Sequence, residues 1–432
     1  MKFSEKRKEK IRKKRKPLVI FADDILISYY YWSKAIKEIG MPSKIIRYAY
    51  IEKNYIIDEN DFSYYYEDIV KLQLRALKKN KIVSFIFAVI RSSMDEIFLI
   101  SFLILDYLFK KGDVIVSSLH PLRILNYDSY KHYFKKFGCK IVIFPYGSDF
   151  WQYSKLEDPS FKLTLLMHYP QYAIEEESIY EHIKFWVKNA DFISMGAAMD
   201  GLGRVDMFMV NYITIDTGKW VAKKKYSYND GKNGTVCIVH TPNHRFIKGT
   251  EYISHAVEEL KREGYKIELL ILEKVKNPLV REILYSKADI LVEKIIHNGC
   301  YGQSALEGMA SGIPVVSNFE NEKVAKAFRR YSYLDECPLI FSNPENIKDD
   351  LKQLIENPGL RIELGKAGRA YVEKYHSFKT FQFIFSNILE KIWWENKEIN
   401  LTTLFHPLLK NSYNNLYPKI THTLKNNRII NN

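Results

Sequence analysis

The stretch that decides the fold is NGCYGQSALEGMASGIPVV, residues 298–316. Glycines at 299 and 302 let the backbone approach a ligand closely. A helix that starts near Gly302 would point free N–H groups and the positive end of its dipole at a bound phosphate. Glu307 lies about one turn inside, where its carboxylate can accept hydrogen bonds from ribose hydroxyls. Gly312 and Pro314 end the helix and begin a buried strand. An ordinary helix with a surface glutamate is the structural alternative.

A second stretch precedes it by roughly 50 residues and reads VHTPNHRFIKGT, residues 239–250. A strand ends here, a polar loop follows, and Thr250 is a plausible N-cap for the next helix. Arg245 and Lys248 therefore lie at the carboxyl end of a strand, beside a helix start. Two cations in that place can neutralise a diphosphate leaving group, which gains negative charge as it departs. Two solvated surface cations are the structural alternative.

The rest of the chain alternates short apolar runs with amphipathic stretches, which predicts open, mostly parallel α/β sheets. The pattern fails in the polar, glycine-rich segment 211–235, which we take as a domain boundary. Predicted strands are 18–22, 44–49, 114–118, 140–144, 192–195, 207–210, 235–239, 266–272, 289–292, 314–317 and 339–342. Predicted helices are 30–39, 65–79, 127–137, 179–188, 250–262, 278–286, 302–310, 346–356 and a last stretch from about 359 to 394.

These two stretches, in this order and spacing, resemble the C-terminal domain of GT-B glycosyltransferases, and most closely the large retaining family 4, the "glycosyl transferases group 1". The resemblance covers roughly residues 235–390 and includes LRIELGKAGR at 360–369, which is similar to that family's closing helix. It implies two Rossmann-like α/β domains whose sheets face each other across a cleft. We expect a basic tail at 1–16, an acceptor domain at 17–220, a nucleotide-sugar domain at 221–390, and a helix end with a basic tail at 391–432.

The resemblance also implies residue roles. Arg245 and Lys248 would hold the donor diphosphate and serve catalysis, and Glu307 would bind the ribose. The family has two glutamates with seven residues between them, and where the first would stand this sequence has Gly299. Glu293 is therefore our candidate replacement near the donor sugar. The full set of expected donor-binding residues is Arg245, Lys248, Glu293, Gly302, Gln303, Ser304 and Glu307.

The N-terminal half should hold the acceptor and a group near the reacting carbon. Asp149 is the first candidate, because it follows a strand and is flanked by Phe150 and Trp151, which could stack on a sugar; a turn stabilised by its carboxylate is the alternative. His120, after another strand, is the second catalytic candidate, with a structural role as its alternative. Lower-ranked candidates are His168, Tyr169, Asp23 and Asp24.

The net charge of +14 is concentrated at the ends. Residues 1–16 carry ten Lys or Arg against two Glu, and residues 399–432 carry four Lys or Arg and no acid. Basic ends on a nearly neutral body argue against a nucleic-acid-binding protein. They fit contact with an anionic membrane surface or solvated tails. Four dispersed cysteines and the absence of a signal-peptide pattern predict a cytoplasmic protein, peripheral to the inner membrane face in the first case.

We therefore expect a metal-independent, retaining glycosyltransferase that moves a hexose-type sugar from a nucleotide-diphosphate donor to a glycan or lipid-linked acceptor. No cofactor and no metal site are expected, since Arg245 and Lys248 would replace a divalent ion. Two alternatives remain: a catalytically degenerate GT-B protein that acts as a sugar-binding or scaffold module, and a sugar-nucleotide epimerase.

Overall fold

A computed structural model gives the fold of the chain. It describes residues 15–22, 27–47, 64–65, 112–118, 138–147, 149–195, 201–208, 213–297, 301–331, 334–406, 409, 413–425 and 428–429. Several predictions fall outside these ranges: the sites at Asp23, Asp24, His120 and Gly299, the helix at 127–137, and residues 1–14 of the basic tail.

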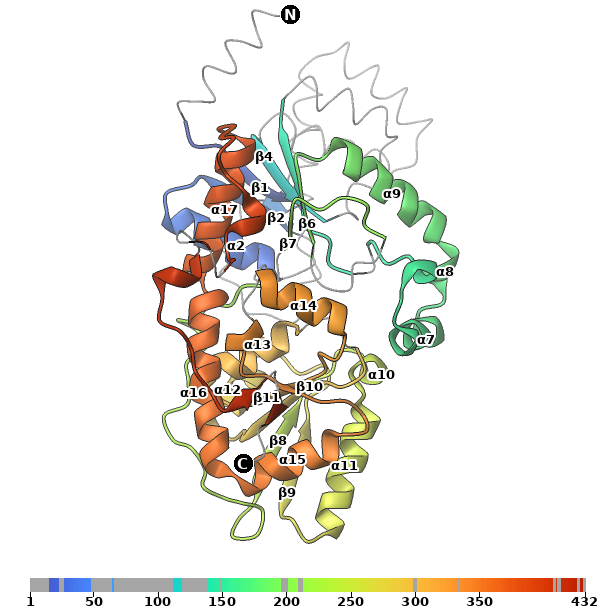
Figure 1. Cartoon of the computed structure of the whole chain (residues 1–432), viewed down its shortest axis with the longest axis vertical. Coiled ribbons are helices and arrows are strands. Elements are labelled where there is room, and N and C mark those ends of the chain that lie inside the picture. Colours follow the sequence, from blue (N-terminus) through green and yellow to red (C-terminus); the bar gives the residue numbers. More distant parts are fainter. Residues whose placement is uncertain are drawn as a thin grey trace, which may run out of the picture.

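The first lobe is built on a seven-stranded parallel sheet, in the upper half of Figure 1. Residues 19–22, 114–117 and 141–143 of its central strands are buried, as expected for a parallel sheet covered by helices. Helices α2 (Ile27–Glu38) and α9 (Glu176–Asn189) belong to this lobe. The strand order is β3 (Tyr64–Tyr65), β2 (Ser43–Arg47), β1 (Val19–Ala22), β4 (Val114–Ser117), β5 (Lys140–Ile143), β6 (Phe192–Met195), β7 (Met207–Phe208).

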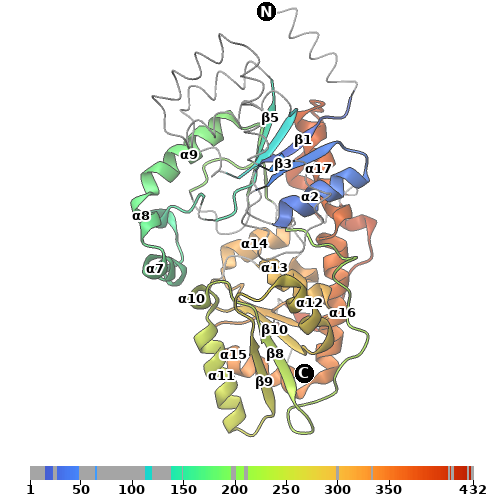
Figure 2. The ribbon, with the colours of Figure 1, turned by 180° about the vertical axis from the view of Figure 1, so that it is seen from behind.

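The second lobe is a five-stranded parallel sheet with helices around it, in the lower half of Figures 1 and 2. The strand order is β12 (Ile340–Phe341), β11 (Val315–Ser317), β10 (Ile290–Lys294), β8 (Val236–His240), β9 (Ile267–Ile271). Its helices are α10 (Arg245–Lys248), α11 (Thr250–Arg262), α12 (Asn277–Ser286), α13 (Gln303–Ala310), α14 (Glu322–Tyr331), α15 (Ile347–Glu356) and α16 (Pro358–Tyr375). Two parallel α/β sheets with flanking helices confirm the predicted fold class.

The chain passes between the lobes twice. The first passage is the polar segment after β7, and the second is the junction of α16 with α17 (Phe378–Ile392). Helix α17 packs on α2 of the first lobe, where the Phe381 and Trp32 rings stack with centroids 4.7 Å apart. The Trp32 indole also donates a hydrogen bond to Thr214 of the first passage. Helix α17, expected with the second domain, therefore lies in the first lobe.

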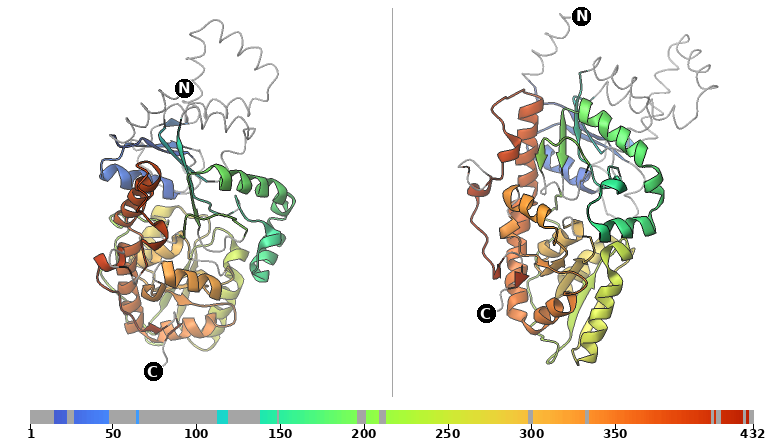
Figure 3. Two further views of the ribbon diagram at one scale, coloured as in Figure 1. Left: turned by 45° about the horizontal axis from the view of Figure 1, so that its top comes forward. Right: turned by 45° about the vertical axis from the view of Figure 1, so that its right-hand side comes forward.

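Three local expectations differ from the structure. The last helical stretch is two helices, because residues 376–377 break it. Strand β3 (Tyr64–Tyr65) lies where a helix was expected to begin at residue 65, and the rest of that expected helix falls outside the described residues. Helices α7 (Pro159–His168), α8 (Gln171–Ile174) and α14 were not predicted. Helices α7 and α8 form an arm that extends from the first lobe toward α10, as the right-hand view of Figure 3 shows.

Both ends of the described chain are attached to the body. Arg15 forms two hydrogen bonds of 2.6 Å with the carboxylate of Asp113, and the Lys16 ammonium donates to the Ile39 carbonyl oxygen. Near the C-terminus, residues 417–425 run beside α16, and the amide of Thr423 donates to the Glu363 carboxylate. The segments expected as basic tails are thus fixed to the body at residues 15–16 and 417–425.

Candidate functional site

The second sheet has a topological switch point between its neighbouring strands β8 and β10. After β8 the chain continues through α11 to β9 on one side, and after β10 it continues through α13 to β11 on the other. In open α/β sheets, ligands bind outside the carboxyl ends of the strands at such a point. Both quoted sequence stretches lie here: one follows β8 and the other follows β10.

Lys248 and the start of α13 meet at one carboxylate. The Lys248 ammonium lies 3.1 Å from Oε1 of Glu293, and the Gly302 amide donates to the same oxygen over 2.9 Å. The other oxygen of Glu293 accepts from the Ser317 hydroxyl at 2.8 Å. A Cβ at position 302 would lie 2.8 Å from Glu293 Oε1, so a larger residue there would displace the carboxylate. A cation and a helix amino end therefore converge at the switch point.

Glu293 is ionised in this setting although its side chain is completely buried. Burial by itself raises the pKa of Glu293, but the positive charges of Lys248 and Lys294 and the Ser317 hydroxyl outweigh it, so the net shift is downward. Its buried carboxylate thus holds the ammonium and the α13 turn in place. Its two oxygens are bound by Lys248, Gly302 and Ser317, and its expected contact with a donor sugar stays a prediction.

Arg245 begins the one-turn helix α10 but faces other acids. Its guanidinium forms ion pairs of 3.2 Å with Glu251 in α11 and with Glu273 after β9. Hydrogen bonds to these two carboxylates raise the pKa of Arg245. The side chain is 37% exposed, whereas that of Lys248 is 16% exposed. Of the two expected cations, Lys248 is the one that the structure brings to the start of α13.

Glu307 lies buried in α13 and is bound by polar neighbours. The Asn277 side-chain amide donates to it over 3.0 Å, and Gln303 is a second partner. Burial raises the pKa of Glu307 to about 8, so the neutral acid predominates at pH 7. Burial raises the pKa of Tyr31 in α2, and the negative charge of Glu307 adds to that shift.

Two buried oxygens near the switch point have no hydrogen-bond partner within the described residues. They are Oε1 of Gln303, in the first turn of α13, and Oγ1 of Thr241, directly after β8. Buried polar atoms usually find a partner, so each is a candidate contact for a bound polar ligand. Gln303 was predicted as a donor-binding residue, and Ser304 lies beside it in the same turn. Asn277 and Thr241 were missed, because neither stands in a pattern that distinguishes it.

In the first lobe, the Asp149 carboxylate accepts hydrogen bonds from the backbone amides of Tyr146 and Gly147, at 3.1 and 2.8 Å. This buried carboxylate therefore stabilises the turn after β5, as the structural alternative described. The catalytic assignments of Asp149 and His120 stay predictions.

The two lower-ranked aromatic candidates lie where the lobes touch. The His168 ring of α7 stacks on Phe246 of α10 with centroids 4.1 Å apart, and the Tyr169 hydroxyl bonds to His244. Phe161 stacks in the same way on His297, which follows β10, at 4.0 Å. The α7 arm therefore covers the loops at the carboxyl edge of the second sheet. Phe161 and His297 were not identified from the sequence.

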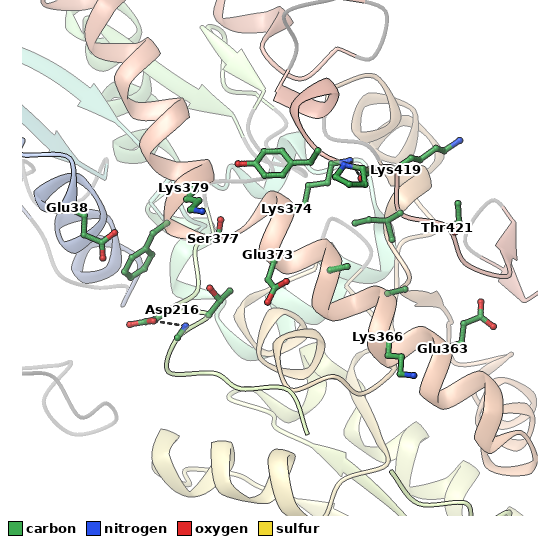
Figure 4. A pocket seen from close by; sticks show the side chains of 18 of the residues that line it. Glu38, Asp216, Glu363, Lys366, Glu373, Lys374, Ser377, Lys379, Lys419 and Thr421 are labelled. Atoms are coloured by element: carbon green, nitrogen blue, oxygen red, sulfur yellow. Dashed lines mark hydrogen bonds between the residues drawn. The ribbon is translucent and has the colours of Figure 1, made fainter. Parts of the chain in front are cut away.

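A cavity of about 990 Å³ lies away from this edge, between α2, α16 and residues 417–421 (Figure 4). Its acids are bound by neighbours, as when Glu373 pairs with Arg369 at 2.6 Å. The Lys366, Lys379 and Lys419 side chains line it. In the described part of the chain, no cluster of three His, Cys, Asp or Glu is arranged to hold a metal ion. None of the described helices is long and apolar enough to cross a membrane.

Two parallel α/β lobes, with cationic and helix-terminal groups at the switch point of the second, define the GT-B fold of glycosyltransferases. The solved structures with this architecture include HepE of Anabaena in complex with UDP, with a TM-score of 0.51 and 10% identity over 87% of this chain and 100% of that one. HepE with UDP-glucose matches over the same shares of the two chains, with a TM-score of 0.51 and 11% identity. No protein-family profile matches the sequence, and no curated protein does.

Proposed function

We propose that this chain is a glycosyltransferase that moves a hexose-type sugar from a nucleotide-diphosphate donor to a glycan or lipid-linked acceptor. The observation that carries the proposal is the meeting of the Lys248 ammonium and the Gly302 amide at Glu293 Oε1. This places a cation and a helix amino end at the switch point, the combination that binds phosphate groups. The fold supports it, and HepE, which shares the fold, binds UDP and UDP-glucose.

In this proposal the diphosphate contacts the Lys248 ammonium and the free amides in the first turn of α13. Arg245 would turn from Glu251 and Glu273 toward the outer phosphate, a small cost because exposed ion pairs contribute little. Glu293 would act as a positioning residue for Lys248. Glu307, neutral at pH 7, can both donate to and accept from ribose hydroxyls. The orphaned Gln303 Oε1 would accept from a donor hydroxyl.

The chemistry we propose is retaining and independent of metal ions, as the resemblance to family 4 implies. The bond between the sugar's anomeric carbon and the donor phosphate oxygen breaks, and the acceptor oxygen forms its bond on the same face. The leaving phosphate oxygen takes the acceptor's proton. Lys248 and Arg245 would stabilise the negative charge that develops on the diphosphate. The acceptor would lie against the first lobe, near the turn of Asp149 and the α7 arm.

Calorimetric titration with a panel of UDP-, GDP- and ADP-sugars, with UDP-glucose first, tests donor binding. We expect at least one to bind and to raise the melting temperature with the logarithm of its concentration. Analysis of the products then separates transfer from epimerisation, since an epimerase needs no acceptor. Binding without turnover would favour the sugar-binding alternative, and no binding to any member of the panel would overturn the proposal. Full activity in EDTA is expected, and a loss restored only by Mg²⁺ would contradict the metal-independent reaction.

A further inference from the structure

His376 lies where both passages between the lobes meet. It occupies the break between α16 and α17, and it is completely buried. Its Nδ1 lies 2.7 Å from the carbonyl oxygen of Ile213, and its own carbonyl oxygen accepts from the Ile215 amide at 2.9 Å. Ile213 and Ile215 belong to the first passage. One histidine thus binds the two segments that join the lobes.

The other ring nitrogen of His376 reaches the donor side of the second lobe. Its Nε2 lies 2.9 Å from the hydroxyl of Tyr301, and that hydroxyl lies 2.8 Å from the hydroxyl of Tyr371. Tyr301 is completely buried and directly precedes Gly302. The Gly302 amide in turn donates to Glu293, the partner of Lys248. The hydrogen bonds of His376 and those of Glu293 are therefore linked through the adjacent residues Tyr301 and Gly302, beside the proposed diphosphate site.

The carbonyl oxygen of Ile213, at one end, fixes the direction of these hydrogen bonds. A carbonyl oxygen only accepts, so Nδ1 of His376 carries the proton that binds Ile213. Nε2 is then an acceptor and receives the Tyr301 hydroxyl proton, which leaves the Tyr301 oxygen to accept from Tyr371. Burial lowers the pKa of His376 to about 4, which keeps the ring neutral and this arrangement intact at neutral pH. A phenylalanine at position 301 could not join the set.

We propose that His376 and Tyr301 are positioning residues, which tie the turn at the start of α13 to the connection between the lobes. For its effect on donor binding the inference rests on the proposed function. A change in the angle between the lobes would move His376 and Tyr301, and with them the Gly302 amide. Closure of the lobes and assembly of the diphosphate site would then be a single event.

Amide hydrogen exchange tests the tie without any ligand. Tyr301→Phe and His376→Asn should speed exchange in peptides spanning 301–306 on the order of tenfold, since a lost hydrogen bond makes local opening easier. Asparagine keeps a donor for Ile213, but its side chain is too short to place an acceptor at the position of Nε2 for Tyr301. His376→Gln, which can present an oxygen near the position of Nε2, should exchange more slowly than His376→Asn. Tyr265→Phe is the matched control, because it removes a hydroxyl that bonds to Glu356 just before β9 begins, at the amino edge of the sheet.

Titration with UDP then tests the link to the donor. We expect Tyr301→Phe and His376→Asn to weaken UDP binding on the order of tenfold, and the double variant to weaken it no more than either alone. Unchanged exchange at 301–306 in both variants would overturn the tie. Faster exchange with unchanged UDP affinity would overturn the link to the site. If the wild-type chain binds no nucleotide, the proposed function fails, while the exchange result still decides the tie.

Discussion

The Lys248 ammonium and the Gly302 amide share a single oxygen of Glu293, at 3.1 and 2.9 Å. Lys248→Ala should lower donor turnover by tenfold to a thousandfold, on the order expected when a group that stabilises a developing charge is removed. Steady-state kinetics with the donor identified by titration measures it. Lys261→Ala, an exposed lysine paired with Glu258 in α11, is the control and should leave turnover unchanged.

The same variant leaves the Glu293 charge buried and without Lys248, which costs about 3–5 kcal/mol of stability. The double variant Lys248→Ala with Glu293→Gln removes that charge. It should recover much of the midpoint of urea unfolding but none of the donor turnover. If turnover recovers together with stability, Lys248 has only a structural role.

Arg245→Ala should differ from Lys248→Ala in its effect on stability. Its ion pairs with Glu251 and Glu273 are exposed, so their loss should change the melting temperature little. If Arg245 turns to the diphosphate, donor turnover should still fall at least about tenfold. Lys287→Ala breaks a comparable exposed pair with Glu268 at the other edge of the sheet, and serves as the control. Equal kinetics in the two variants would remove Arg245 from the donor site.

Much of the second lobe could be predicted because local sequence determines it. Residues 250–262 were predicted as a helix with the bounds of α11, since buried Ile253, Val257 and Leu260 recur at helical spacing. Helix α7 was missed because Leu163, Leu166 and Met167 are exposed, which hides its buried face in the sequence pattern. The break at His376 was missed because the residues that bond to it, Ile213 and Ile215, are distant in the sequence.

The candidate site, too, could be predicted only in part from the sequence. The sequence placed Arg245, Lys248 and the α13 turn at one sheet edge, because strand order brings the ends of β8 and β10 together. It did not reveal side-chain directions. Glu273 lies 28 positions from Arg245 along the chain and Glu293 lies 45 positions from Lys248, so neither pairing follows from local spacing.

Lys374 and Glu336 form a buried ion pair of 2.8 Å, with both side chains 5% exposed. The pair also holds the C-terminal segment, because Lys374 donates to the Pro418 carbonyl oxygen and Glu336 accepts from the Ile420 amide. Lys374→Ala should lower the free energy of unfolding by about 3–5 kcal/mol, since it leaves a buried carboxylate unpaired. Urea unfolding measures this, with the exposed Lys366→Ala on the same helix as control. A loss no larger than that of the control would contradict the prediction.

Residues 1–14 carry eight Lys or Arg against two Glu. We propose that they bind an anionic membrane surface, where each basic residue contributes about 1 kcal/mol. Deleting residues 1–14 should weaken sedimentation with phosphatidylserine vesicles at low salt, while Arg15 and Lys16 keep their contacts with Asp113 and Ile39. A variant with these eight residues changed to Gln controls for length. Equal binding by all three proteins would show that the segment takes no part.

Glu307 should give the protein a distinctive pH dependence. Its pKa is about 8 in the fold because of burial, against 4.5 for the free group, so the folded protein keeps a proton that the unfolded chain releases. Wherever the folded state binds more protons, stability falls as pH rises. This contribution therefore declines from about pH 4.5 to about pH 8 and then levels off. Between pH 6.5 and 8 the buried histidines His240 and His376, with pKa values lowered to about 4 by burial, stay neutral and do not mask it.

Glu307→Gln removes this titration, and its amide oxygen can still accept from Asn277. Urea unfolding at pH 6.5, 7.25 and 8 should therefore show wild-type stability falling relative to the variant, on the order of 1–2 kcal/mol across the window. Donor affinity gives a second reading, because a carboxyl and an amide can both bind ribose hydroxyls. At pH 6.5 the variant should bind the donor about as well as the wild type, while Glu307→Leu should bind it at least about tenfold less well. Parallel stability curves for wild type and Glu307→Gln would show that Glu307 titrates near its usual pKa, and that its buried position leaves it charged at neutral pH.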